Sequence, residues 1–233
     1  MAARNYGQYC GVTTALELVG ERWALLIVRD LFVGPRRYTD LKQGLPRIPT
    51  NILSTRLKEL QDAGVVRRLP MAHGLAYDLT DYGRALEDVV LALGRWGFQA
   101  MGEPADGDVV TSDSLTMALR TAFRADAAST LPTTAYEVRV GEIALGVRVA
   151  PDGLLIAPLP GSSGTPAPAG VDPLAGGVDL AFDTGPGIRS VISGELAPAD
   201  AIENGTVRVL AGNPALLERF AETFRLSPHP DTP

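Results

Sequence analysis

The chain has 233 residues, 45% of them apolar, with one cysteine, two histidines and a formal net charge of −6. This length permits one large or two ordinary domains, and no apolar run approaches the roughly 18 residues of a membrane-spanning helix. A single cysteine excludes an internal disulfide framework, and the scarcity of histidine and cysteine argues against a structural zinc site. The first residues lack the apolar core of a secretory signal, so we expect a cytoplasmic protein without membrane insertion.

The charge is unevenly distributed along the chain. Residues 1–101 carry 13 basic and 10 acidic side chains, whereas residues 102–233 carry 8 and 17. Within residues 36–68 there are 8 basic and 3 acidic side chains, a local charge of +5. A basic segment of this kind is compatible with nucleic acid even in an acidic chain.

Two helices are predicted over residues 12–20 and 22–33. The second has apolar residues at i, i+3 and i+4 with one acidic interruption, namely Trp23, Leu26, Ile27, Asp30 and Leu31. Gly34 and Pro35 end it, since proline cannot continue a helix.

A short helix is expected next, over Asp40–Gln43. Either Thr39 or Asp40 supplies a side-chain oxygen that can cap it. Gly44 then ends it.

A longer amphipathic helix begins near Pro49, where a missing N–H costs nothing in the first turn. Its buried stripe is formed by Leu53, Leu57 and Leu60. The opposite side carries small polar residues and a lysine, namely Asn51, Ser54, Thr55 and Lys58. Such side chains suit a helix that reads DNA bases and touches phosphates; an ordinary solvated helix face is the alternative.

Two short strands follow, Val65–Leu69 and Leu75–Leu79, joined by a loop with His73 at its tip. Consecutive strand residues point to opposite faces, so only one of Arg67 and Arg68 can face DNA directly and the other can pair with an acid. Helix and hairpin together predict a winged helix-turn-helix. The predicted DNA contacts are Arg37, Thr50, Asn51, Ser54, Thr55, Lys58, Arg67, Arg68 and His73.

Thr80 caps a last N-terminal helix, expected over residues 81–101. Its apolar residues exceed what a small three-helix core can absorb, which predicts a homodimer with Trp96 as an anchor. Packing of Trp96 within its own subunit is the alternative.

The rest of the chain predicts a second domain. Residues 103–111 form a linker, 112–227 an α+β domain with an antiparallel sheet of about five strands and flanking helices, and 228–233 a frayed tail; the first domain then spans 1–102. Strands are expected at 134–140, 142–150, 154–156, 178–185 and 206–210, and helices at 112–125, 188–193, 199–203 and 214–224. Residues 158–177, rich in proline and glycine, are expected to be a mobile surface loop or lid.

The N-terminal pieces Cys10 with VTTALELVGERW, LLIVRDLFVGPRRYTDL, LSTRLKELQDAGVVRR and YDLTDYGRALEDVVLALGRW resemble the HxlR family of bacterial winged-helix regulators. The resemblance covers about residues 8–98. It implies a homodimeric transcription factor that binds double-stranded DNA, has no catalytic activity and dimerises through its first and last helices. Two features depart from the family: the wing, residues 69–77, is shorter and lacks the paired prolines, and Pro49 replaces a common serine.

The resemblance also draws attention to Cys10, because some family members sense electrophiles or oxidants through an N-terminal cysteine. Sensing requires a lowered thiol pKa and solvent access. A lone cysteine is otherwise a small buried apolar residue.

The C-terminal region resembles sterol-carrier-protein-like domains, in the stretch from Ala197 to Gly205, in VRVLAGNP and in Leu216–Phe224. The resemblance implies an apolar pocket for a fatty-acid or sterol-like effector. Its candidate lining residues are Leu119, Phe123, Leu216, Phe220 and Phe224, although residues of this kind more often simply belong to a core.

Two other classes of function compete with that of a regulator. No nucleophile elbow, phosphate loop or histidine–carboxylate constellation is present, so no enzyme, cofactor or metal is predicted. A lipid carrier that uses the winged helix only to dimerise is the alternative function. The basic segment 36–68 disfavours it, because dimerisation would not require that charge.

Overall fold

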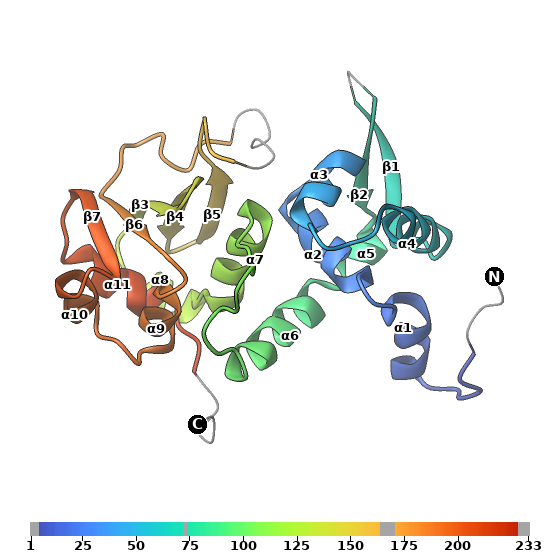
Figure 1. The fold of residues 1–233 in the computed structure, drawn as a ribbon. Coiled ribbons are helices and arrows are strands. Elements are labelled where there is room, and N and C mark those ends of the chain that lie inside the picture. Colours follow the sequence, from blue (N-terminus) through green and yellow to red (C-terminus); the bar gives the residue numbers. More distant parts are fainter. Residues whose placement is uncertain (1–4, 72–73, 164–170, 228–233) are drawn as a thin grey trace. The chain divides into compact units, whose positions relative to one another are not determined.

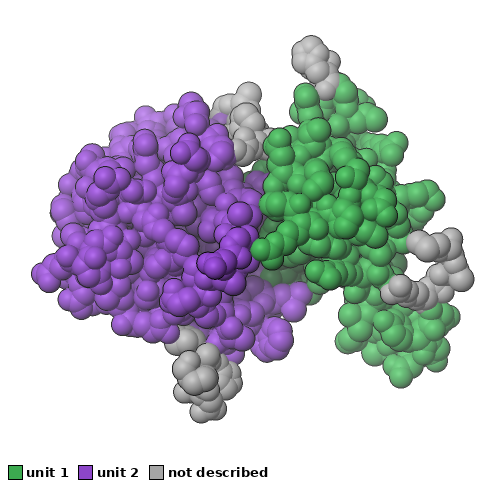
Figure 2. Space-filling view, in the orientation of Figure 1, with its two compact units in different colours: residues 1–90 green, residues 91–233 purple. Residues whose placement is uncertain are grey.

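The computed structural model describes residues 5–71, 74–163 and 171–227. Within it the chain forms two compact units, residues 1–90 and 91–233 (Figures 1 and 2). The boundary falls inside helix α6 (Glu87–Gln99). The prediction of a mainly α winged-helix N-terminal region followed by an α+β region is confirmed.

The N-terminal unit packs short helices against a two-stranded hairpin. Its elements are α1 (Gly11–Val19), α2 (Ala24–Val33), α3 (Tyr38–Gly44), α4 (Thr50–Asp62), β1 (Val66–Met71), β2 (Gly74–Leu79), α5 (Asp81–Arg84) and the start of α6. Leu53, Leu57 and Leu60 are buried as their spacing predicts, and they pack in a core with Ile27 and Leu31 of α2. Leu26, expected on the buried side of α2, is instead 39% exposed.

Helix α3 begins earlier than the sequence suggested. The Asp40 carboxylate accepts a hydrogen bond at 2.8 Å from the backbone N–H of Arg37. A carboxylate at the third helical position that reaches back in this way satisfies a free N–H. The helix therefore starts at Tyr38 with Arg37 at the N-cap position, so Thr39 does not cap it, and Asp40 caps it from within the first turn.

The predicted helix over residues 81–101 is two helices, α5 and α6, separated at Ala85 and Leu86. The Thr80 hydroxyl does accept from the N–H of Gly83 at 3.0 Å. A Cβ on Gly83 would lie 2.1 Å from the carbonyl oxygen of Val65, so this turn is pressed against the hairpin. The prediction of one continuous helix missed this tertiary contact.

The C-terminal unit is a five-stranded sheet with flanking helices. Its strands are β3 (Thr134–Val140), β4 (Ile143–Ala150), β5 (Gly153–Pro158), β6 (Leu180–Thr184) and β7 (Val207–Gly212). Its helices, besides the second half of α6, are α7 (Ser112–Ala122), α8 (Ala125–Ser129), α9 (Ile188–Ser193), α10 (Pro198–Glu203) and α11 (Leu216–Thr223). Helices α7 and α8 lie against β4 and β5, and α10 lies against β7 and α11.

The sheet is mixed, whereas an antiparallel sheet was predicted. The strand order is β5-β4-β3-β6-β7, and β3 pairs with β6 in parallel. After the antiparallel run of β3, β4 and β5, the chain crosses to the other side of β3. A parallel pair needs a connection of about a dozen residues or more, which the segment 159–179 supplies. Residues 164–170 of the predicted mobile loop lie outside the described residues.

Aromatic rings form the centre of the C-terminal core. The ring of Phe220 lies 5.4 Å from Tyr136, 5.2 Å from Phe182 and 4.6 Å from Phe224, measured between centroids. Phe98, at the end of α6, packs against this core. In the described part of the chain, no helix is both long and apolar enough to span a membrane.

Candidate nucleic-acid interface

The solvent-facing side of α4 is polar and presents several side chains together. Thr50, Asn51, Ser54 and Lys58 are exposed and Thr55 is half-exposed, while the leucines on the other side are buried. The structure therefore brings five of the predicted DNA contacts onto one helix face. That face is held rigidly, since the buried stripe fixes the helix rotation.

Hydroxyl groups on this face donate to the helix backbone. Ser54 Oγ donates to the carbonyl of Thr50 at 3.1 Å, and Thr55 Oγ1 donates to the carbonyl of Asn51 at 2.9 Å. The Tyr38 hydroxyl also donates to the Thr50 carbonyl, at 2.8 Å. The hydroxyl oxygens of Ser54 and Thr55 retain acceptor capacity for a base edge. Tyr38, which links α3 to the start of α4, was missed from sequence.

Two basic residues flank the polar face. Lys58 is paired with Asp62 at 3.5 Å, but both side chains are mostly exposed, so the pair is weak. Arg37 is exposed at the start of α3. Both cations are accessible to phosphate groups.

The hairpin register separates Arg67 from Arg68. Arg67 faces Asp78 across the strands, and its Nε and Nη2 atoms donate to Asp78 Oδ2 at 3.2 and 2.9 Å. Arg84 donates to the other oxygen, Oδ1, at 2.8 Å. Asp78 is buried, so it holds both guanidinium groups in fixed positions at the base of the hairpin. Arg84 was missed because its approach to Asp78 depends on the α5 turn.

Arg68 projects differently and stacks over the Tyr77 ring at 5.9 Å. The same Tyr77 exchanges backbone hydrogen bonds with Arg36, at 2.9 and 2.7 Å. These bonds tie the hairpin to the α2–α3 connection and thus to the helix-turn-helix. His73, at the predicted loop tip, lies outside the described residues.

Cys10 lies immediately before α1 and is exposed. Hydrogen bonds from the backbone N–H groups of Thr13 and Val12 and from the Thr13 side chain hold the pKa of the Cys10 thiol below its ordinary value. A thiol at the start of a helix is stabilised as thiolate in this manner. The two chemical requirements for reactivity, access and a lowered pKa, are met.

The candidate lining residues of the C-terminal pocket belong to the packed core. Leu119, Phe220 and Phe224 are fully buried, and Phe123 and Leu216 pack against the same cluster. Phe123 and Phe224 lie 6.0 Å apart between ring centroids. The five side chains therefore lie in or against one packed cluster.

Residues 18–104 match the HxlR-like helix-turn-helix family. The chain is 42% identical over 96 residues to Rv3095, an HTH-type transcriptional regulator of Mycobacterium tuberculosis, covering 40% of this chain and 60% of that protein. It is 35% identical over 85 residues to the HTH-type transcriptional regulator YvaP of Bacillus subtilis, covering 35% of this chain and 79% of the relative. It is also similar to the reduced form of the transcriptional regulator YodB from B. subtilis, at 33% identity, 42% and 100% coverage and a TM-score of 0.36.

Proposed function

The chain belongs to the HxlR-like helix-turn-helix family, and we propose that it is a transcriptional regulator that binds specific double-stranded DNA as a homodimer. The observation that carries this proposal is the polar face of α4, held by three buried leucines beside the hairpin. The chain spans 60% of the length of its mycobacterial relative.

In this mechanism α4 enters the major groove. Asn51 can donate and accept toward a base edge, and Ser54 and Thr55 offer hydroxyl oxygens. Lys58, Arg37 and the arginines of the hairpin meet phosphates. In a dimer, two copies of α4 would read half-sites about 34–36 Å apart.

The dimer is proposed from exposed apolar side chains. On α6, Val89, Leu93 and Trp96 recur at spacings of four and three residues, and Trp96 is 73% exposed. On α1, Val12 and Leu16 are also exposed. Burial of such residues by a second copy would remove them from water. Sedimentation velocity of Trp96→Ser against wild type tests this: a shift to monomer supports the dimer, and an unchanged mass contradicts Trp96 as its anchor.

Response to oxidants is proposed as a second property, because Cys10 is exposed and has a lowered pKa. The expected result is that an oxidant or electrophile changes DNA affinity in the wild type and leaves Cys10→Ser unchanged. An equal response in both proteins would remove Cys10 from the mechanism.

Modulation by a fatty-acid or sterol-like ligand is a separate proposal for the C-terminal unit. The five candidate residues are packed together, so a ligand would have to displace ring contacts. Native mass spectrometry and melting curves with such lipids test it: bound lipid and a raised melting temperature support it. Lipid-free protein with an unchanged melting temperature would end it, and would also end the alternative of a lipid carrier.

A further inference from the structure

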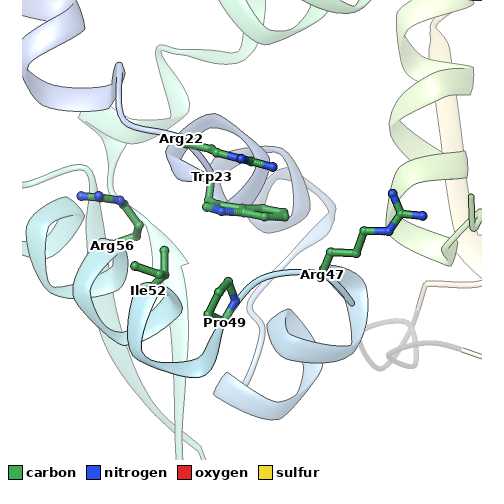
Figure 3. Close-up of a pocket in the computed structure, with 6 residues that line it drawn as sticks. All are labelled: Arg22, Trp23, Arg47, Pro49, Ile52 and Arg56. Atoms are coloured by element: carbon green, nitrogen blue, oxygen red, sulfur yellow. The ribbon is translucent and has the colours of Figure 1, made fainter.

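The polar face of α4 has two flanks, which differ in what lies beside them. With about 100° of rotation per residue, Ile52 and Arg56 lie along one flank, and they line a cleft of about 340 Å³ beside Trp23 (Figure 3). The cleft is lined mainly by apolar atoms, and Arg56 is already paired with Glu21 and Glu59. On this flank the groups beside the polar face are therefore mainly apolar.

On the other flank, Tyr38 of α3 brings a hydroxyl group against the first turn of α4. Its Oη donates to the Thr50 carbonyl oxygen at 2.8 Å, and Ser54 Oγ lies 3.3 Å from the same Oη. Ser54 Oγ also lies 3.1 Å from the Thr50 carbonyl oxygen. Tyr38 is half-buried and Ser54 is exposed. Tyr38, Thr50 and Ser54 thus form a small hydrogen-bonded set at the edge of the polar face, which we call the Tyr38 cluster.

The Thr50 carbonyl oxygen has three donors around it. The α-helical pattern directs the backbone N–H of Ser54 at this oxygen, and the Tyr38 and Ser54 hydroxyls approach it as well. A carbonyl oxygen has only two lone pairs. The backbone N–H and the shorter Tyr38 bond fill them, so the hydroxyl hydrogen of Ser54 is the donor that is held least.

The other position open to this hydrogen is also a poor one. A bond from Ser54 to Tyr38 Oη would span 3.3 Å, which is longer than the usual O–H···O separation of about 2.7–2.8 Å. Neither internal acceptor therefore holds the Ser54 hydrogen well. A group outside the protein can take it at little cost.

Thr55, the next residue along α4, has a different environment. Its Oγ1 donates to the carbonyl oxygen of Asn51 at 2.9 Å. Within the part of the chain that the structure describes, that carbonyl accepts from no other side chain. The Thr55 hydrogen is therefore committed and its oxygen remains an acceptor, whereas Ser54 can still donate. Two neighbouring hydroxyls on one face thus offer opposite hydrogen-bonding chemistry.

We propose that Tyr38 helps to determine which bases α4 reads, by keeping the hydroxyl hydrogen of Ser54 available to a base acceptor in the major groove. The acceptors there are guanine O6 and N7, adenine N7 and thymine O4. Without the tyrosine hydroxyl, Ser54 would donate to the Thr50 carbonyl and would present only its oxygen. Tyr38 is thus a positioning residue that acts through Ser54. This inference rests on the proposed function.

The first test compares Tyr38→Phe, Ser54→Ala and the double variant. Each single change should lower the ratio of cognate to random affinity by about two- to tenfold, the range of one net hydrogen bond. The double variant should lose no more than Ser54→Ala alone, because Tyr38 acts only through Ser54. Affinity for random DNA should stay unchanged, since no charge is altered. Tyr82→Phe is the matched control: it removes the hydroxyl of a tyrosine that is 58% exposed, and it should bind like wild type.

A second test separates this role from a merely structural contact between α3 and α4. Binding to every single-base-pair variant of a half-site measures which positions each protein reads. Tyr38→Phe and Ser54→Ala should lose discrimination at the same single position and retain it at the others. A structural defect in α4 would weaken discrimination at every position. Melting curves establish that each variant is folded at the temperature of the measurement.

The outcomes separate this inference from the proposed function. Full selectivity in either single variant, losses that multiply in the double variant, or lost discrimination at different positions or at every position would overturn it. An equal fall of cognate and random affinity in Tyr38→Phe would also overturn it, because the hydroxyl would then contact a phosphate. Wild-type protein that fails to bind DNA selectively contradicts the function itself, whereas any of these results with a selective wild type contradicts only the role of Tyr38.

Discussion

The two units of the chain differ in whether their most informative residues are exposed or buried. The N-terminal unit buries leucines and presents polar and basic side chains to solvent on α4, whereas the C-terminal unit buries Tyr136, Phe182, Phe220 and Phe224. Exposed side chains on a well-packed helix can bind a partner, whereas buried aromatic rings stabilise the fold. The comparison explains why DNA binding is proposed for the first unit.

The largest effect is expected from the buried ring that touches the other three. Phe220→Ala should destabilise the C-terminal unit by about 3–5 kcal/mol, through lost burial and an unfilled cavity. Denaturant unfolding measures it, with exposed Val178→Ala expected within about 0.5 kcal/mol of wild type. DNA affinity of the folded variant should be retained. If the folded Phe220→Ala variant lost DNA binding, the assignment of DNA binding to the N-terminal unit alone would be contradicted.

Asn51→Ala should produce the next largest change, on recognition and not on stability. Discrimination between cognate and random DNA should fall by about 1–3 kcal/mol, the value of a well-formed amide–base contact. Competition binding with both DNAs measures it. Equal losses on cognate and random DNA would mean that Asn51 contacts only the backbone.

Lys58→Ala should weaken binding to all sequences alike and reduce the salt slope by about 1. The paired variant Asp62→Asn is a useful control, because it removes the carboxylate that lies 3.5 Å from Lys58. It should strengthen binding slightly to every DNA. Sequence-dependent changes in either variant would show that Lys58 reads bases.

The smallest predicted effect concerns Cys10. Because its pKa is lowered, a larger fraction of the thiol is ionised at neutral pH than in an ordinary cysteine. The rate of alkylation by iodoacetamide should therefore reach half its maximum at a lower pH in the folded protein than in denatured protein. A midpoint equal to or above that of the denatured chain would contradict this environment.

The spacing of apolar residues predicted an element well where its buried residues all lie along that same element. Leu53, Leu57 and Leu60 are spaced along one helix, so their burial and the opposite polar face could be inferred from sequence. The split between α5 and α6 could not, because it depends on Gly83 lying against the distant carbonyl of Val65. The parallel pairing of β3 with β6 likewise depends on the path of a long connection.

The candidate site shows the same division. The polar residues of α4 follow from helical spacing, but the pairing of Arg67 and Arg84 with Asp78 depends on strand register and on the α5 turn. Trp23, the residue before α2, has a left-handed backbone with a φ of 81°. A left-handed tryptophan has no signature in sequence, since residues with a Cβ rarely adopt that conformation.

The central claim is tested most directly by binding of the purified protein to DNA from upstream of its own gene, in competition with random DNA at several salt concentrations. The account predicts selective binding by a dimer, with affinity that falls steeply as salt rises. Binding without selectivity at every salt concentration, under reducing and oxidising conditions and with lipid added, would contradict it.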